Sequence, residues 1–390
     1  MSALDSEQLE TKVIAWRREI HAHPELGFQE HRTSALVERE LTAAGIDTMR
    51  MVTTGVVGTI KGTRPGKTLL LRADMDALPL DERSGESFSS TSPGVMHACG
   101  HDAHTAMLLG AAVSLAAQRD RIAGTIKFVF QPAEEGPGGA KPMIDAGVLE
   151  NPRVDAAVMI HVLPLLETGV VGWRTGPMMA SADEFRLEIG GRGGHAAAPH
   201  LGVDTIPVAA EIVGALQRIT SREVDPLENV VLSIGTIHGG QRSNIIADRT
   251  ELTGTVRCLN ETVRTSIPQR IERIARGVCA AHGARCTLHY EMGYPSVQND
   301  TRLVNLIADV LREALDITRL VELPAPRMGA EDFAYFAQAV PGCMLRLGVA
   351  PPGERDPAML HAAEFRLDER ALRTGVSVFR ELALRLPAIV

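Results

Sequence analysis

The sequence is poor in aromatic residues and in cysteine. Only 4% of its 390 residues are aromatic, so composition gives no sign of a large stacking pocket for an aromatic ligand. The cysteines number five, which is odd, and they are widely spaced: Cys99, Cys258, Cys279, Cys286 and Cys343. This pattern does not indicate the disulfide framework of a secreted protein, and it favours a reducing, cytoplasmic setting.

The sequence also lacks long apolar runs and an excess of basic charge. No segment reaches the roughly 18 to 20 uninterrupted apolar residues of a membrane helix, and "MSALDSEQLETKV" has no apolar signal core. The formal net charge is -8, from 48 acidic and 40 basic residues that are scattered along the chain. A nucleic-acid binder needs a basic face, so we expect neither a nucleic-acid nor a membrane partner.

The chain does contain enough apolar residues, 45% of the total, to bury one large core or two. In its first part, "KTLLLRADMDALP" begins with a short apolar run, and "VDAAVMIHVLP" is a second such run. Both predict strands buried on two faces, whereas "HTAMLLGAAVSLAAQ" predicts an apolar helix. This alternation of helices and buried strands predicts an α/β domain with a mostly parallel sheet.

The pattern changes near residue 182. The segment "DEFRLEIGG" alternates and places Phe185, Leu187 and Ile189 on one face. A predicted helix near 204–219, two strands, a helix near 263–281 and the strand "ARCTLHYEM" follow, which is the β-α-β-β-α-β order of a ferredoxin-like fold. After Pro295 the first pattern returns. We therefore predict a discontinuous domain, 1–182 plus 296–390, with a smaller domain, 183–295, inserted in it.

Polar side chains gather where the buried strands of the first domain end. Cys99 and His101 lie two residues apart in "HACGH", so on an extended segment they point the same way. Glu134 and Glu135 follow the strand "FVFQ", and His161 follows "AAVMI". Functional groups collect beyond the carboxyl ends of parallel strands, so we expect these five to converge. Thiolate, imidazole and carboxylate are ligands of zinc and related divalent metals.

The adjacent carboxylates at 134 and 135 predict two separate roles. If Glu135 ligates a metal, Glu134 faces the metal-bound water, whose pKa falls towards about 7. Glu134 can then act as general base and later as general acid. A solvated turn is the alternative for this pair taken alone. Asp76, after a buried strand, either caps a turn or supports a ligating histidine, and we favour support. For His104 we prefer packing or support to ligation.

These motifs carry a family resemblance. The segments are "HAHPELGFQE", "RADMDALP", "MHACGHDAHTAMLLGAA", "FQPAEEG", "GGHAAAPH", "GAEDFAYF" and "LHAAEF", which span residues 21–365. Together they resemble the dinuclear-metal aminoacylase and carboxypeptidase superfamily, in the branch of hippurate hydrolases, plant auxin–amino acid conjugate hydrolases and N-acetyl-diaminopimelate deacetylases. The resemblance implies a metallohydrolase domain and an inserted α+β ferredoxin-like lid and dimerisation domain.

The resemblance also implies a ligand set for two divalent ions per subunit, which vary among manganese, zinc, cobalt and nickel. Cys99 matches a thiolate that bridges the two metals, and Glu134 matches the general acid/base. The other ligands that the resemblance implies are His101, Glu135, His161 and His361. Residue patterns alone do not single out His361, which by itself is typical of a loop histidine.

In the inserted domain, His195 matches a histidine that, in relatives, reaches the partner subunit's active site and stabilises the oxyanion. Asn244 and Arg257 fall near substrate-carboxylate and oxyanion contacts of the family, and arginine is suited to bind a carboxylate through two hydrogen bonds. Gly329 is expected to let the backbone approach the substrate. The resemblance thus implies a homodimer or a dimer-based homo-oligomer.

We interpret the sequence as a metal-dependent amidohydrolase for N-acyl amino acids or similar small amides with a free carboxylate. Two alternatives stay open. In a cysteine hydrolase, Cys99 would be the nucleophile and His101 or His161 its base, which leaves the pair of glutamates without a role. In a non-catalytic metal- or peptide-binding relative, Glu134 would have no reason to be present.

Overall fold

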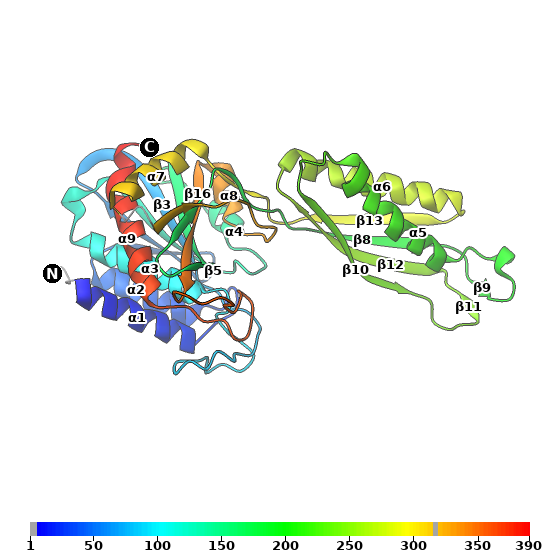
Figure 1. Ribbon diagram of the computed structural model, residues 1–390, viewed down its shortest axis with the longest axis horizontal. Helices are drawn as coiled ribbons and strands as arrows, with labels where there is room; N and C mark the ends of the chain where they lie inside the picture. The colour runs from blue at the N-terminus through cyan, green and yellow to red at the C-terminus, as the bar shows by residue number, and fades with distance from the viewer. Residues whose placement is uncertain (1–5, 315–318) are drawn as a thin grey trace. The chain divides into compact units, whose positions relative to one another are not determined.

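The computed structural model describes residues 6–314 and 319–390. The chain forms two compact units (Figure 1). One unit contains Met1–Gly176, Gln298–Ala325 and Tyr335–Val390, and the other contains Pro177–Val297 and Pro326–Ala334. The sequence analysis places Pro326–Ala334 in the first domain. This segment groups with the second unit because Arg327 bridges to Met179 and the Gly329 carbonyl accepts from the amide of Ala180.

The first unit is built on an eight-stranded sheet in the order β1-β2-β4-β3-β5-β16-β6-β15. Its strands are β1 (Asp47–Met51), β2 (Gly55–Lys61), β3 (Arg64–Asp74), β4 (Ala123–Gln131), β5 (Ala156–Glu167), β6 (Val171–Trp173), β15 (Leu320–Glu322) and β16 (Gly342–Ala350). The central strands β4, β3, β5 and β16 pair in parallel. The predicted mostly parallel α/β fold is therefore confirmed.

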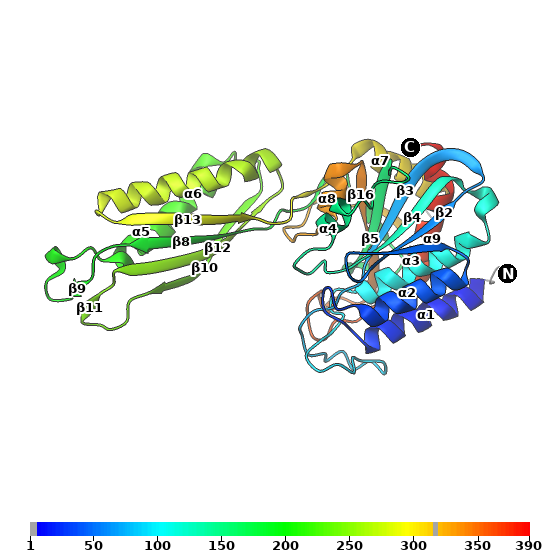
Figure 2. The same cartoon turned by 180° about the vertical axis from the view of Figure 1, so that it is seen from behind.

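Helices cover this sheet (Figure 2). They are α1 (Ser6–Ala22), α2 (His31–Ala43), α3 (His101–Ala116), α4 (Ala140–Asp145), α7 (Thr301–Ala314), α8 (Ala334–Ala339) and α9 (Arg370–Arg385). The apolar helix α3 packs between α1 and α9 and is buried nearly all round. Glycine allows these close approaches, since a Cβ at Gly110 would lie 2.5 Å from Val13 and one at Gly375 would lie 2.0 Å from Met107.

A buried ion-pair network ties α1 to the start of α3. Asp102 accepts hydrogen bonds from Arg17 Nε at 2.9 Å and His21 Nδ1 at 2.8 Å, and all three side chains are buried. Burial disfavours the imidazolium of His21, but Asp102 and Glu82 outweigh it and raise its pKa to about 9. Asp102 therefore serves to orient the helix that begins at His101.

The second unit has a four-stranded antiparallel sheet in the order β10-β12-β8-β13. Its strands are β8 (Asp183–Gly190), β10 (Val230–Gly239), β12 (Arg249–Cys258) and β13 (Arg285–Met292), and its helices are α5 (Thr205–Arg218) and α6 (Glu261–Ala281). Phe185, Leu187 and Ile189 of β8 are buried in one core with residues of both helices. Asp204 and Asn260 cap the helices. The chain order is β-α-β-β-α-β, as the sequence predicts.

Two short ladders complete the structure. β7 (Gly176–Met179) pairs with β14 (Val297–Asn299), and β9 (Gly194–His195) pairs with β11 (Ile245–Ile246). Within residues 6–314 and 319–390, none of the helices has both the length and the apolar character needed to cross a bilayer.

Candidate functional site

The candidate site of the first unit is formed by polar residues on or just after β3, β4 and β5. β3 ends at Asp74, and β4 ends at Gln131, just before Glu134 and Glu135. His161 was expected beyond its strand but lies inside β5. The reason is register, because the pairing of β5 with β3 ends at Met159, whereas its pairing with β16 continues past His161. At His161, β5 therefore pairs with β16 on one edge but no longer with β3 on the other edge.

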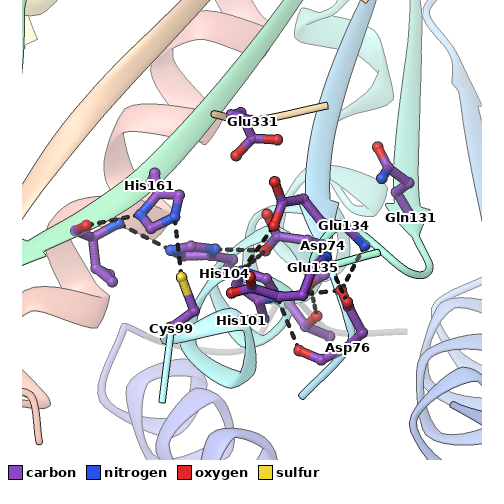
Figure 3. Close-up of polar contacts among 12 residues, drawn as sticks. Asp74, Asp76, Cys99, His101, His104, Gln131, Glu134, Glu135, His161 and Glu331 are labelled. Carbon is purple, nitrogen blue, oxygen red and sulfur yellow. Dashed lines mark hydrogen bonds and ion pairs between the residues drawn. The ribbon is translucent and has the colours of Figure 1, made fainter. Parts of the chain in front are cut away.

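Two sets of three potential ligands share Cys99. One set is Cys99, His101 and His161, and the other is Cys99, Glu135 and His361; within each set the ligand atoms all lie within 4.8 Å of one another. Figure 3 shows Cys99, His101, His161 and the two glutamates directed toward one space. His361 is brought there by its backbone, since its amide donates to the Ala98 carbonyl at 2.9 Å. The structure therefore brings together all five ligands that the resemblance implies.

Hydrogen bonds set the tautomers of two of these histidines. His101 Nδ1 donates to the Asp76 carbonyl at 2.9 Å, and His161 Nδ1 donates to the Val162 carbonyl at 2.8 Å. Because a carbonyl only accepts, both Nδ1 atoms carry a proton and Nε2 is the atom that can ligate a metal. Among the described residues, the buried Nε2 of His101 has no hydrogen-bond partner. This donor set fits a divalent metal ion.

The pKa values of two proposed ligands, Cys99 and His361, are raised. Burial raises the pKa of the Cys99 thiol, and the charge of Glu135 raises it further. Hydrogen bonds to Cys99 and Glu135 raise the pKa of His361 to about 10. Metal ligation requires a thiolate and a neutral imidazole, so ions would bind with release of these protons. Cys99 therefore lacks the lowered pKa that is typical of a reactive cysteine.

Asp76 supports both the helix-borne ligand and the glutamate turn. Its carbonyl accepts from His101 Nδ1. Its carboxylate accepts from the backbone amides of Glu134 and Glu135, each at 2.9 Å (Figure 3). The Glu134 side chain lies close to the ligands, with its Oε2 4.0 Å from His101 Nε2. One buried aspartate therefore fixes a ligand and the backbone of both adjacent carboxylates.

His104 is used as a support of the strand that carries His161. Its Nδ1 donates to Asp74 at 2.6 Å, and its Nε2 accepts from the amide of Val162 at 2.9 Å. Both ring nitrogens are therefore occupied, and His104 is not a ligand. Asp74 is held in turn by a buried ion pair with Arg72 at 2.6 Å. Sequence reasoning missed the role of Arg72, although the residue opens the motif "RADMDALP".

The second unit brings His195 and Asn244 together. His195 lies on β9, where it pairs with Ile245, and the Asn244 carbonyl accepts from the amide of Ala196 at 3.0 Å. His195 is exposed, and its Nδ1 accepts from the amide of Ala197 at 3.0 Å. Its Nε2 therefore carries the proton and is a hydrogen-bond donor, as stabilisation of an oxyanion requires.

Arg257 and Gly329 lie at the other end of this unit. The carbonyl of Cys258, next to Arg257, accepts from the amide of Ser181, and the amide of Ala180 donates to the Gly329 carbonyl. Strand β12 runs from Arg249, beside the β9–β11 ladder, to this end (Figure 1). At about 3.3 Å per residue, Arg249 and Arg257 are roughly 26 Å apart. The residues expected to contact substrate are therefore split into two pairs.

Comparisons with known proteins find similar sequences and structures. A model of Peptidase family M20/M25/M40 matches residues 70–385. The chain is 42% identical over 386 residues to thermostable carboxypeptidase 2 of Saccharolobus solfataricus, covering 98% of this chain and 97% of that protein. It is 46% identical over 295 residues to an N-acyl-L-amino acid amidohydrolase of Geobacillus stearothermophilus, with coverage of 75% and 79%. It also resembles a solved dinuclear metal-binding M20 peptidase of Bacillus subtilis, with a TM-score of 0.86, 34% identity and coverage of 98% and 99%.

Proposed function

Because the chain belongs to peptidase family M20/M25/M40 and is a metal-dependent hydrolase, we propose that it hydrolyses the amide bond of N-acyl amino acids or similar small amides with a free carboxylate. The observation that carries this proposal is the pair of three-residue ligand sets that share Cys99, with Glu134 beside them. A matched relative is named for N-acyl-L-amino acids, which supports this substrate class.

In the proposed reaction, two divalent ions would be held by Cys99, His101, Glu135, His161 and His361. The ions, when bound, supply an activated water and polarise the amide carbonyl. Glu134 would accept a proton from the water that attacks the carbonyl carbon. As the C–N bond breaks, Glu134 returns the proton to the leaving amine. Asp76 keeps Glu134 in place, because the Asp76 carboxylate accepts a hydrogen bond from the backbone amide of Glu134.

The second unit is proposed to act as lid and dimerisation domain. Roughly 26 Å separate the two ends of β12, which is longer than a small N-acyl amino acid. This separation supports the proposal that His195 and Arg257 of one chain contact different substrate molecules. We propose that His195 of the partner subunit donates its Nε2 proton to the oxyanion, with Asn244 beside it. Arg257 and Gly329 are proposed to contact substrate as a separate pair.

The proposed function is tested by metal removal and reconstitution. We expect chelator-treated protein to lose hydrolysis of N-acetyl and N-benzoyl amino acids and of dipeptides, and to regain it with two equivalents per chain of manganese, zinc, cobalt or nickel. Blocking the substrate carboxylate as an amide is the matched control and should raise KM. Catalysis by metal-free protein would contradict the proposal. Inactivity of the metal-loaded protein on every substrate would favour the non-catalytic relative.

Substitution of Cys99 separates a bridging thiolate from a thiol nucleophile. Cys99→Asp should keep two metal ions and measurable activity, because a carboxylate can also bridge two cations. Cys99→Ala should lose both. We would measure metal content by mass spectrometry alongside kcat, with Cys286→Ser of the second unit as the control thiol. If Cys99 were the nucleophile, both variants would be inactive while metal-free wild-type protein remained active.

A further inference from the structure

The turn that carries the two glutamates is held by a second buried carboxylate besides Asp76. We propose that Glu30, in the motif "HPELGFQE", is a positioning residue for Glu134. Three consecutive backbone amides of the turn donate to carboxylates. The amide of Ala133 donates to Glu30 Oε1 at 2.9 Å, and the amides of Glu134 and Glu135 donate to Asp76. This inference rests on the proposed function, because it assigns Glu134 the proton transfer.

Hydrogen bonds around Glu30 hold its carboxylate against the backbone amide of Ala133. Glu30 is fully buried, and its Oε2 accepts from the Thr54 hydroxyl at 2.5 Å. Thr54 is held in turn by Ser34, whose hydroxyl donates to the Thr54 and Glu30 carbonyls. Glu30 occupies the N-cap position of α2 but does not cap the helix. Its side chain is directed to the turn instead.

The helix is capped by a different glutamate, which gives the comparison that the test needs. Glu25 accepts from the amides of Arg32 and Thr33 at the start of α2. Glu25 and Glu30 thus lie in the same segment and both accept backbone amides. Only Glu30 reaches the turn before Glu134, so the two residues separate positioning of the site from local stability.

The turn at residues 133–135 requires hydrogen bonds from other segments because its backbone is strained. Ala133 has a φ of 56°, a left-handed conformation that side chains with a Cβ disfavour. Pro132 precedes it and has no N–H, so the first donor of the turn is the amide of Ala133. Gly27 leaves room for this conformation, since a Cβ there would lie 2.9 Å from the Ala133 Cβ. Without Glu30, the buried amide of Ala133 would lose its acceptor.

Loss of this acceptor should displace the glutamate turn, because an unpaired buried amide favours a different backbone conformation. Glu134 must be placed accurately to transfer protons, whereas substrate binding depends on other groups. Four of the five proposed metal ligands, all except Glu135, lie outside the turn. We therefore expect the change to appear mainly in kcat rather than in KM or metal content.

The test compares Glu30→Ala with Glu30→Gln and Glu25→Ala in the metal-loaded full-length protein. For Glu30→Ala we expect kcat to fall about 10- to 100-fold, as for other residues that support a metal site, with KM changed less than about threefold. Glu30→Gln keeps an acceptor for Ala133 and should recover most of kcat. Glu25→Ala should keep wild-type kcat. Amide hydrogen exchange over residues 131–138 should be faster only in Glu30→Ala.

Unchanged kcat and unchanged exchange in folded Glu30→Ala would overturn the inference, as would an equal loss of kcat in Glu25→Ala. If Glu30→Ala does not fold, Thr54→Val is used instead, because it removes only the hydroxyl that donates to Glu30. This variant should show a smaller fall in kcat and a smaller increase in amide exchange. Normal kcat and normal exchange in Thr54→Val would count against the inference. Full activity of Glu134→Gln would contradict the proposed function instead. Amide exchange would still report whether Glu30 holds the turn.

Discussion

Glu134→Gln is expected to lower kcat by at least about 10³-fold while leaving two metal ions bound. Glutamine has the shape of glutamate but cannot accept and return a proton, and general acid–base catalysis contributes about 10²- to 10⁴-fold. Here one residue serves both proton transfers, so the upper part of that range applies. The backbone amide of residue 134 would still donate to Asp76. The measurements are kcat on an N-acyl amino acid and metal content per chain.

The matched control is the adjacent residue. Glu135→Gln alters a proposed ligand on the same turn, next to Cys99 and His361, so it should lower metal content as well as activity. Full metal content in Glu134→Gln and reduced metal content in Glu135→Gln would show that Glu134 carries protons whereas Glu135 ligates metal. A Glu134→Gln protein that retained activity within about tenfold of wild type, or that lost its metal, would rule out the proposed role.

The second large effect is recovery of activity when two inactive variants are mixed. His195→Ala is expected to lose about 10²- to 10³-fold in kcat, as for removal of one oxyanion donor. If His195 acts in the partner's site, a mixed dimer of His195→Ala and Glu134→Gln chains has one intact site. Random exchange makes half of the dimers mixed, so activity should return to about a quarter of wild type.

The control for this mixing experiment pairs His195→Ala with a chain that carries both substitutions. No dimer in that mixture has an intact site, so activity should stay at the level of the variants. Subunit exchange is checked with chains of different mass, and solution mass establishes the dimer. If exchange is complete and the first mixture remains inactive, His195 does not act across subunits.

The family and the α/β fold class were predictable from the sequence because both depend on local patterns. Alternation in β8 and helical periodicity in α5 and α6 follow from which side chains face one core, so the order of elements in the second unit agrees with the structure. The strand ends also placed Glu134 and Glu135 correctly after β4. His161 was misplaced by a few residues because strand length depends on pairing partners.

The sequence by itself determined the fold class, the family and the chemical types of the ligands, since apolar periodicity and short motifs are local properties. Only the tertiary structure decided how the site is supported. His361 reaches Cys99 because its backbone amide binds the Ala98 carbonyl. His104 is excluded as a ligand because both of its nitrogens are already bonded. Glu30 meets Ala133 across about one hundred residues of chain. Hydrogen bonds between distant segments produce no periodic pattern in a sequence, because they involve backbone groups, such as those of Ala98 and Ala133, and ordinary polar side chains.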